Sequence, residues 1–166
     1  MKAKKLILVL LLIIQVGIPT LSAQSKKELK AEVVRIIILS KNYKINVDTY
    51  LPPYRDPILL DYSDNSIKIK NDSVFSDLLY LGQTDILYNI GKELIFQAPL
   101  KKYALNIDKK GNIHIKFSTR TTTDYLNFRI DVYSNGSTNI YVSMRRGQSI
   151  CFSGDLSTQI EETESL

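Results

Sequence analysis

The 166-residue sequence has no tryptophan, one cysteine (Cys151) and one histidine (His114). A single cysteine excludes an intramolecular disulfide. One cysteine and one histidine also fall short of the clustered ligands of a zinc site. Cys151 lies in a strand-like run, which favours a small packed residue over a nucleophile that uses His114 as its base. No spacing indicates a carboxylate pair for glycoside hydrolysis. We therefore predict no catalytic, cofactor-binding or metal-binding residues, and a protein that is not an enzyme.

Long apolar runs are missing too, except near the first residue. Three lysines among the first five residues precede an apolar run over 6–14, and the small residue Ala23 follows. This pattern is typical of a secretory signal peptide over 1–23, cleaved between Ala23 and Gln24. The run is shorter than the ~20 residues of a membrane-spanning helix, and no cysteine stands at the cleavage site for lipid attachment. We expect an exported protein, periplasmic or secreted and not a lipoprotein, with no membrane span after cleavage.

A strong excess of one charge is also absent once the leader is removed. The formal net charge is +5, but without the three leader lysines 19 basic residues face 17 acidic ones, which leaves +2. The remaining charges are interleaved, and basic pairs such as Lys101-Lys102 lie at predicted strand ends. Nucleic-acid binding relies on basic residues that neutralise several phosphates. We therefore expect no nucleic-acid partner.

The predicted mature chain has the length of one domain, which we place at 24–156, followed by a flexible acidic tail at 157–166. Ser25 and Glu28 fit the capping box of a helix that ends near Ser40. The apolar residues of this helix form one stripe: Leu29, Val33, Ile36 and Ile37. A strand stays an alternative here, because 36–38 are three β-branched residues in a row.

From Tyr43 onward the apolar period changes to two, which predicts strands. They cover 43–48, 58–60, 66–70, 74–81, 93–97, 102–107, 113–117, 126–132, 140–144 and 150–154. Prolines make 51–57 a loop, and 108–112 is a turn. Asn135-Gly136 predicts a two-residue hairpin turn in which both residues have φ > 0. We expect a mainly β (α+β) domain, with about eight to ten antiparallel meander strands in a highly curved or barrel-like sheet and the helix covering one opening.

Two short stretches complete this order of elements: Leu-Tyr-Leu-Gly at 79–82 and Gln-Ser-Ile-Cys-Phe-Ser-Gly at 148–154. With them, the chain resembles the family called domain of unknown function 4251, small exported proteins of Gram-negative gut and oral anaerobes. The resemblance spans residues 25–156. It implies a β-rich exported domain without an assigned activity, so no functional residue can be transferred from it. Cys151 stands where the resemblance implies a small polar residue.

Tyrosine is abundant, with ten residues. Tyr125, Tyr133 and Tyr141 are predicted on faces opposite the aliphatic residues. Half-buried strand positions suit tyrosine, and an exposed face for sugars or a partner protein is the alternative. Two functions therefore stay open. One is binding of a small apolar ligand within the curved sheet, which needs an internal cavity. The other is a protein-interaction or inhibitor-like module of the cell envelope, which needs a filled core and an exposed tyrosine-rich face.

Overall fold

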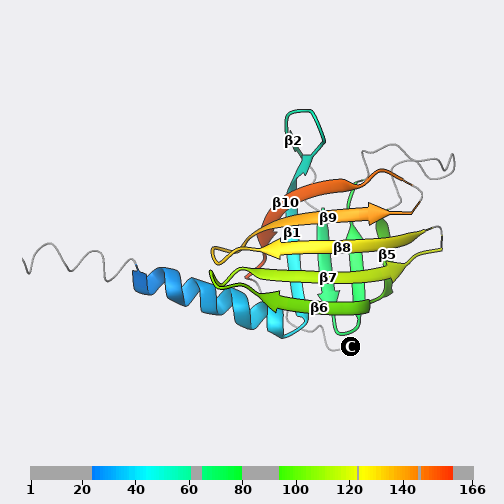
Figure 1. Cartoon of the computed structure of the whole chain (residues 1–166). Helices are drawn as coiled ribbons and strands as arrows, with labels where there is room; N and C mark the ends of the chain where they lie inside the picture. The colour runs from blue at the N-terminus through cyan, green and yellow to red at the C-terminus, as the bar shows by residue number, and fades with distance from the viewer. Residues whose placement is uncertain (1–23, 61–64, 80–93, 123, 146, 159–166) are drawn as a thin grey trace, which may run out of the picture.

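The computed structural model describes residues 24–60, 65–79, 94–122, 124–145 and 147–158. The predicted signal peptide, residues 80–82 of the family-like stretch and most of the acidic tail lie outside these residues. Within them, the chain forms one helix followed by antiparallel strands (Figure 1). No described helix combines the length and the apolar character that crossing a membrane requires.

The helix covers 24–39, and a turn at 40–41 leads into the first strand. The described residues form ten strands: β1 (Asn42–Leu51), β2 (Ile58–Leu59), β3 (Ser66–Lys70), β4 (Ser73–Asp77), β5 (Ile95–Pro99), β6 (Lys101–Ile107), β7 (Ile113–Arg120), β8 (Tyr125–Val132), β9 (Ser137–Met144) and β10 (Ile150–Leu156). Their places agree with the period-two segments of the sequence, except that the strand predicted over 74–81 ends at Asp77; residues 78–79 are not strand, and 80–81 lie outside the described residues. The prediction of a loop over the prolines is also confirmed, since 52–57 separates β1 from β2.

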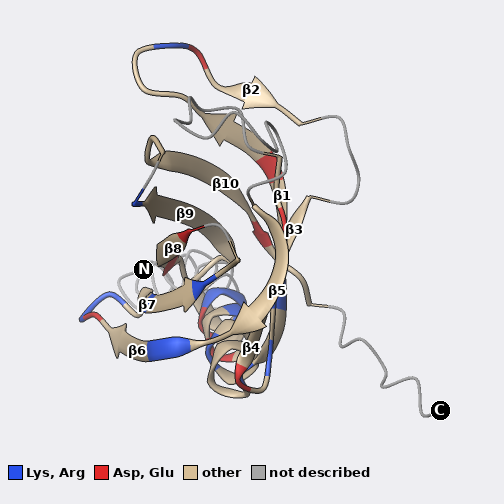
Figure 2. Cartoon of the chain, turned by 90° about the vertical axis from the view of Figure 1, so that its right-hand side faces the viewer, with Lys and Arg blue, Asp and Glu red and all other residues tan. Residues whose placement is uncertain are grey.

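The strands form one sheet in the order β5-β4-β3-β1-β10-β9-β8-β7-β6, and β2 pairs with β1 outside this path. Most neighbours are consecutive in the chain, as in a meander. Two pairs are exceptions: β3 pairs with β1 past the short β2, and β10 returns to pair with β1 and joins the two halves. The sheet curls into a nearly closed barrel, from which the β2 arm projects (Figure 2). The predicted fold class is confirmed.

The two ends of the sheet, β5 and β6, are consecutive in the chain but are not paired with each other. The Thr119 side chain of β7, the partner strand of β6, reaches β5 instead. The Thr119 hydroxyl donates to the Pro99 carbonyl at 2.9 Å, and the Ser118 hydroxyl donates to the Lys101 carbonyl at 3.2 Å. Both hydroxyl residues are buried. Hydrogen bonding of these buried hydroxyls avoids the cost of leaving them unpaired. The Ser118 bond lies within the β6–β7 pairing, whereas the Thr119 bond connects β7 to β5 without a strand ladder.

Apolar side chains fill the inside of the barrel. On β7–β10 most inward apolar residues are at most 3% exposed: Ile113, Ile115, Phe117, Leu126, Phe128, Ile130, Ile140, Val142, Ile150 and Phe152. The rings of Phe117 and Phe128 stack at 4.8 Å between centroids, and Tyr103 stacks on Phe117 at 6.4 Å. Aromatic pairs at such spacing contribute beyond their buried area. The alternate residues of these strands form the outer face of the barrel.

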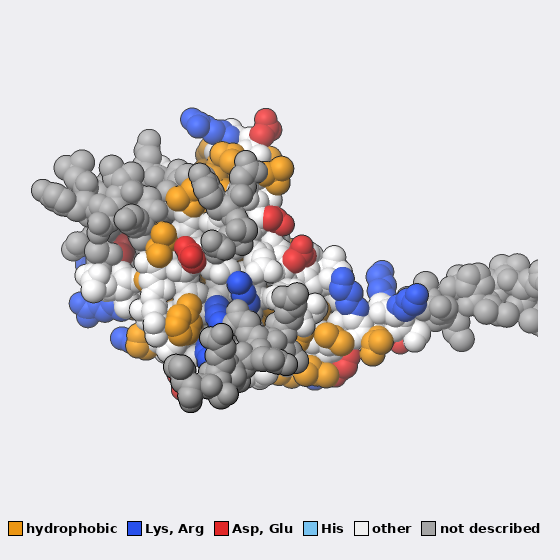
Figure 3. Space-filling view, turned by 180° about the vertical axis from the view of Figure 1, so that it is seen from behind, with side chains coloured by type: hydrophobic (Ala, Val, Ile, Leu, Met, Phe, Trp, Pro, Cys, Tyr) orange, Lys and Arg blue, Asp and Glu red, His pale blue; other side chains and the backbone are white. Residues whose placement is uncertain are grey.

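The helix docks through a different face from the one expected. Val34 and Ile38 are buried, whereas Leu29 and Ile36 of the predicted stripe are 68% and 60% exposed. Of that stripe, Ile37 is partly buried and packs against the core. Figure 3 shows apolar side chains along the projecting helix. Only the last turns of the helix reach the barrel. There the helix packs against the β8–β9 loop, where a Cβ added at Gly136 would lie 3.8 Å from Val34 Cγ2. The position of this loop therefore decides which face of the helix is buried.

The start of the helix also differs from the prediction. Residue 24 is already helical, so Ser25 is not the residue that caps the helix. The Glu28 carboxylate accepts a hydrogen bond from the Gln24 side chain at 3.4 Å instead of closing a capping box.

The β8–β9 turn has one more residue than a two-residue turn. The Tyr133 amide donates to the Ser137 carbonyl at 2.9 Å, so the loop consists of 134–136. Gly136 has a φ of 88°, and Asn135 does not have a positive φ. The Asn135 side chain accepts from the Ser137 amide at 3.1 Å. The predicted two-residue turn is wrong, and a three-residue loop with glycine in the left-handed region replaces it.

Candidate functional site

A groove of about 670 Å³ lies on the outer face of the sheet. A row of directly paired side chains crosses the centre of the groove on β10, β9, β8 and β7. In this central row, Cys151 pairs with Tyr141, Tyr141 with Arg129, and Arg129 with Lys116. Leu51, at the end of β1, extends this row beyond Cys151. Antiparallel pairing brings directly opposed side chains within about 5.5 Å at their Cβ atoms, so these side chains form one continuous surface.

The groove is basic. Lys102, Lys116 and Arg129 line it, and no aspartate or glutamate belongs to its described lining. Lys116 and Arg129 stand directly opposite each other on β7 and β8, an arrangement that destabilises a sheet because the charges are alike. Lys102 has a φ of 53° at an irregularity in the β6–β7 pairing. Such bulges redirect a side chain, and here the redirected residue is a third cation.

Arg129 is held by two neighbours on the outer face. Its guanidinium carbon lies 3.9 Å from the centre of the Tyr141 ring. Its Nε lies 3.8 Å from a carboxylate oxygen of Asp131. The side chain is still 51% exposed. Stacking on an aromatic ring orients a guanidinium and leaves donors at its edge free for a planar acceptor.

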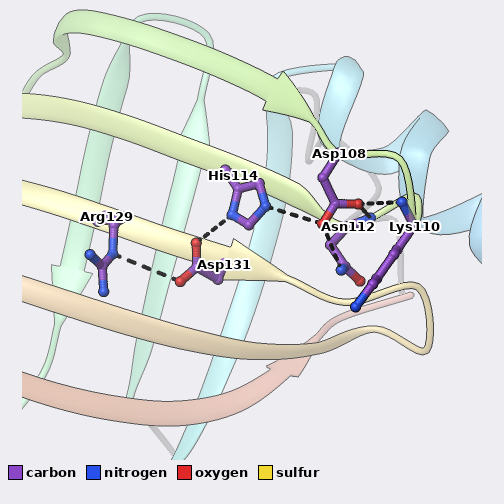
Figure 4. Close-up of polar contacts among 6 residues, drawn as sticks. All are labelled: Asp108, Lys110, Asn112, His114, Arg129 and Asp131. Carbon is purple, nitrogen blue, oxygen red and sulfur yellow. Dashed lines mark hydrogen bonds and ion pairs between the residues drawn. The ribbon is translucent and has the colours of Figure 1, made fainter.

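A second depression of about 560 Å³ shares Lys116 and Arg129 with the groove and adds His114 and Asp131. The His114 Nδ1 lies 2.7 Å from the Asp131 carboxylate, and Nε2 lies 3.5 Å from Asp108 (Figure 4). The hydrogen bond with Asp131 is the main cause that raises the pKa of His114, which favours the protonated imidazolium. An imidazole with a carboxylate at each nitrogen is suited to carrying charge and not to acting as a free base.

Asp108 mainly supports the β6–β7 turn. Its carboxylate accepts from the Asn112 side chain at 2.9 Å and from the amides of Asn112 and Lys110 at 2.9 and 2.8 Å. The Asn112 side chain is the largest cause that lowers the pKa of Asp108 to about 2. The predicted turn over 108–112 is therefore confirmed, with Gly111 at a φ of 81°.

Cys151 lies at one end of the central row, half-buried. Burial raises the pKa of its thiol, and Arg129 and Tyr141 oppose that shift. β9 and β8 separate Cys151 from the strand of His114. At about 4.8 Å between strands, the two side chains are on the order of 14 Å apart. This separation leaves the thiol without His114 as its base. Among the described residues, no group of three or more metal-ligating side chains is placed to hold an ion.

The three tyrosines singled out from the sequence do not share one site. Tyr125 and Tyr141 line the groove. Tyr133 follows the end of β8 and is not part of that lining; its hydroxyl accepts from the Asn139 side chain at 3.1 Å. The other proposed positions, Ala23 and Gln24, belong to the cleavage site, of which only Gln24 is described.

The basic residues of the groove were missed in the sequence. Lys102 belongs to a basic pair that we assigned to a strand end, and Lys116 and Arg129 are 13 positions apart in the chain. The usable signal was the alternation of the strands, which puts both residues on the outer face. Their meeting depends in addition on the β7–β8 register.

Comparison with known proteins agrees with this architecture. The family model for a domain of unknown function, DUF4251, matches residues 25–156. The chain belongs to this family. A crystal structure of a DUF4251 family protein from Bacteroides eggerthii DSM 20697 has a TM-score of 0.61 to this chain at 10% sequence identity, and the match covers 77% of this chain and 87% of that one. At this identity, the likeness between the two DUF4251 proteins concerns the fold. No curated protein matches the chain.

Proposed function

We propose that this DUF4251 domain is an exported, non-enzymatic protein-interaction module of the cell envelope, and that the outer groove is its binding surface. The observation that carries the proposal is the groove itself: about 670 Å³, open to solvent, with Tyr125 and Tyr141 in its lining. Tyrosine is enriched in protein interfaces because its ring buries apolar area while its hydroxyl still finds a polar partner.

The packing of the barrel interior supports this choice over an apolar ligand inside the sheet. Phe117, Phe128 and Phe152 occupy the interior and are at most 3% exposed. A drug-sized ligand needs a pocket of about 300 Å³ or more. To create that volume inside the barrel, stacked rings would have to leave their positions, at a cost typical of core disruption.

Photo-crosslinking in the producing cell tests the proposal. A benzoyl-phenylalanine placed at position 125 should form an adduct with an envelope protein. The same group at Asp155, exposed on β10, is the matched control and should not. The adduct should weaken in the Tyr141→Ser background. Equal adducts at both positions, or none at 125, would contradict the proposal.

Two further measurements address the ligand alternative and export. Native mass spectrometry of protein purified from its own envelope should show the bare chain. A retained small molecule would favour the interior-ligand function instead. N-terminal sequencing of the same sample should begin at Gln24. A sequence that begins within the leader would contradict the proposed cleavage.

A further inference from the structure

We propose that the groove binds an acidic peptide segment of the partner protein, through carboxylates that pair with Lys102, Lys116 and Arg129. This inference rests on the proposed function and adds the chemistry of the partner to it. The residues that carry it are cations on three neighbouring strands, β6, β7 and β8.

The first argument is uncompensated charge. Within the described part of the chain, Lys102 and Lys116 have no carboxylate at ion-pair distance. Lys116 also faces Arg129 directly across the β7–β8 ladder. Two opposed cations weaken the sheet locally, and of the two only Arg129 regains contacts among the described residues, with Tyr141 and Asp131. A carboxylate bound between them would convert this repulsion into two charge-assisted hydrogen bonds.

The second argument is the geometry of Arg129. Its guanidinium covers one face of the Tyr141 ring at 3.9 Å, so that face is already occupied and cannot stack on a sugar. Only Nε is directed to Asp131. The terminal nitrogens of an oriented guanidinium form the fork that carboxylates accept in a bidentate manner. This favours a carboxylate over a neutral sugar.

The third argument is the length of the basic surface. A further depression of about 720 Å³ shares Tyr125 and Asn127 with the groove. It adds three more cations, Lys101, Arg120 and Arg145, and a single acidic residue, Asp124. The basic surface therefore continues past the groove. Such a strip fits a chain that carries several carboxylates better than it fits one small anion, and potentials of this kind also steer association.

The binding experiment uses a fluorescently labelled peptide of alternating glutamate and alanine, with fluorescence anisotropy as the readout. The same peptide with glutamine in place of glutamate is the ligand control. We expect the glutamate peptide to bind about tenfold or more tightly than the glutamine peptide, because each lost charge-assisted hydrogen bond costs roughly that factor. Binding should weaken as salt is added, since exposed charges are screened.

The variant experiment separates the groove from net charge. The double variant Lys116→Gln with Arg129→Gln should lose at least about tenfold in affinity for the glutamate peptide. The control double variant, Lys70→Gln with Lys109→Gln, also removes two positive charges, one from β3 and one from the β6–β7 turn. It should bind the glutamate peptide as tightly as the parent protein does. The urea midpoint of the groove variant should stay within about 0.5 M of the parent, because the lost contact of Arg129 with Tyr141 and the relieved repulsion between Lys116 and Arg129 oppose each other. A residue needed for folding would lower it.

Four results would overturn the inference. These are equal affinity for the glutamate and glutamine peptides, equal losses in the two double variants, displacement of the peptide by millimolar inorganic phosphate, or tighter binding of oligogalacturonate than of the glutamate peptide. If the inference fails while the adduct at position 125 persists, the groove still binds a partner through other chemistry. If the adduct is absent, the proposed function fails as well.

Discussion

Two isoleucines on the same helix provide a sharp test of how the helix docks. Ile38 is fully buried and Ile36 is 60% exposed, although both belong to the same apolar run. Replacing each by alanine removes the same atoms. We expect Ile38→Ala to lower the free energy of unfolding by about 2–5 kcal/mol, the range for isoleucine-to-alanine changes in a core.

Ile36→Ala should change that free energy by no more than about 0.5 kcal/mol. The exposed side chain loses little burial, and alanine has the higher helix propensity, by a few tenths of a kcal/mol. Ile36→Ala is therefore the matched control for Ile38→Ala. The two variants should differ by at least about 1.5 kcal/mol, which exceeds the uncertainty of most extrapolated values.

Urea denaturation of the purified protein measures both changes. With a slope of about 2 kcal/mol per molar urea, a loss of 3 kcal/mol moves the midpoint by roughly 1.5 M. Equal midpoints for the two variants would refute the docked face. A larger loss for Ile36→Ala would mean that the stripe expected from the sequence is the one that meets the barrel.

Three other outcomes can be measured on the same protein. In Gly154→Ala, the new Cβ would overlap the backbone of β1, so the free energy of unfolding should fall by about 1–3 kcal/mol or more; an unchanged urea midpoint would show that β1 can move away. Because Asp131 chiefly raises the pKa of His114, the stabilisation from this pair is complete below pH ~6.5 and is lost as pH rises through the raised pKa. His114→Gln should abolish that decline in stability with rising pH, and a parallel decline in the variant would contradict it. Burial raises the pKa of the Cys151 thiol, so iodoacetamide at neutral pH should alkylate it more slowly than free cysteine; a faster rate would indicate an activated thiol.

Strand positions could be predicted because burial on one face imposes a period of two. In β8, for example, Leu126, Phe128 and Ile130 are buried and alternate with outward residues. The return of β10 onto β1 has no such local signal, since it joins segments about a hundred residues apart. It depends on the close approach that Gly154 allows to the backbone of β1.

The helix face could not be predicted for a different reason. Leu29, Val33 and Ile36 satisfy the amphipathic pattern, but only the last two turns of the helix touch the barrel. Periodicity shows which residues share a side, whereas burial depends on where the neighbouring element lies. Here that element is the β8–β9 loop, which meets Val34.

The basic centre of the groove follows from the length of that same loop. The outward residues of β8 and β9 have odd numbers, and the inward ones have even numbers. Because two directly paired residues point to the same face of the sheet, their numbers must add to an even sum. A two-residue loop at 135–136 would give an odd sum and set Arg129 opposite the buried Val142. Because a shift of one residue exchanges the two faces of a strand, the apolar pattern rules this pairing out. The three-residue loop gives the observed pairing of Arg129 with Tyr141, which stacks the guanidinium, and the β7–β8 ladder then sets Lys116 on its other side. The alternation thus requires Arg129 and Lys116 to face outward but does not require either to be basic. Tyr141 and Asp131 account for the charge of Arg129 within the fold, whereas Lys116 has no carboxylate partner among the described residues, so its charge calls for an explanation outside the fold. A carboxylate-bearing partner supplies one.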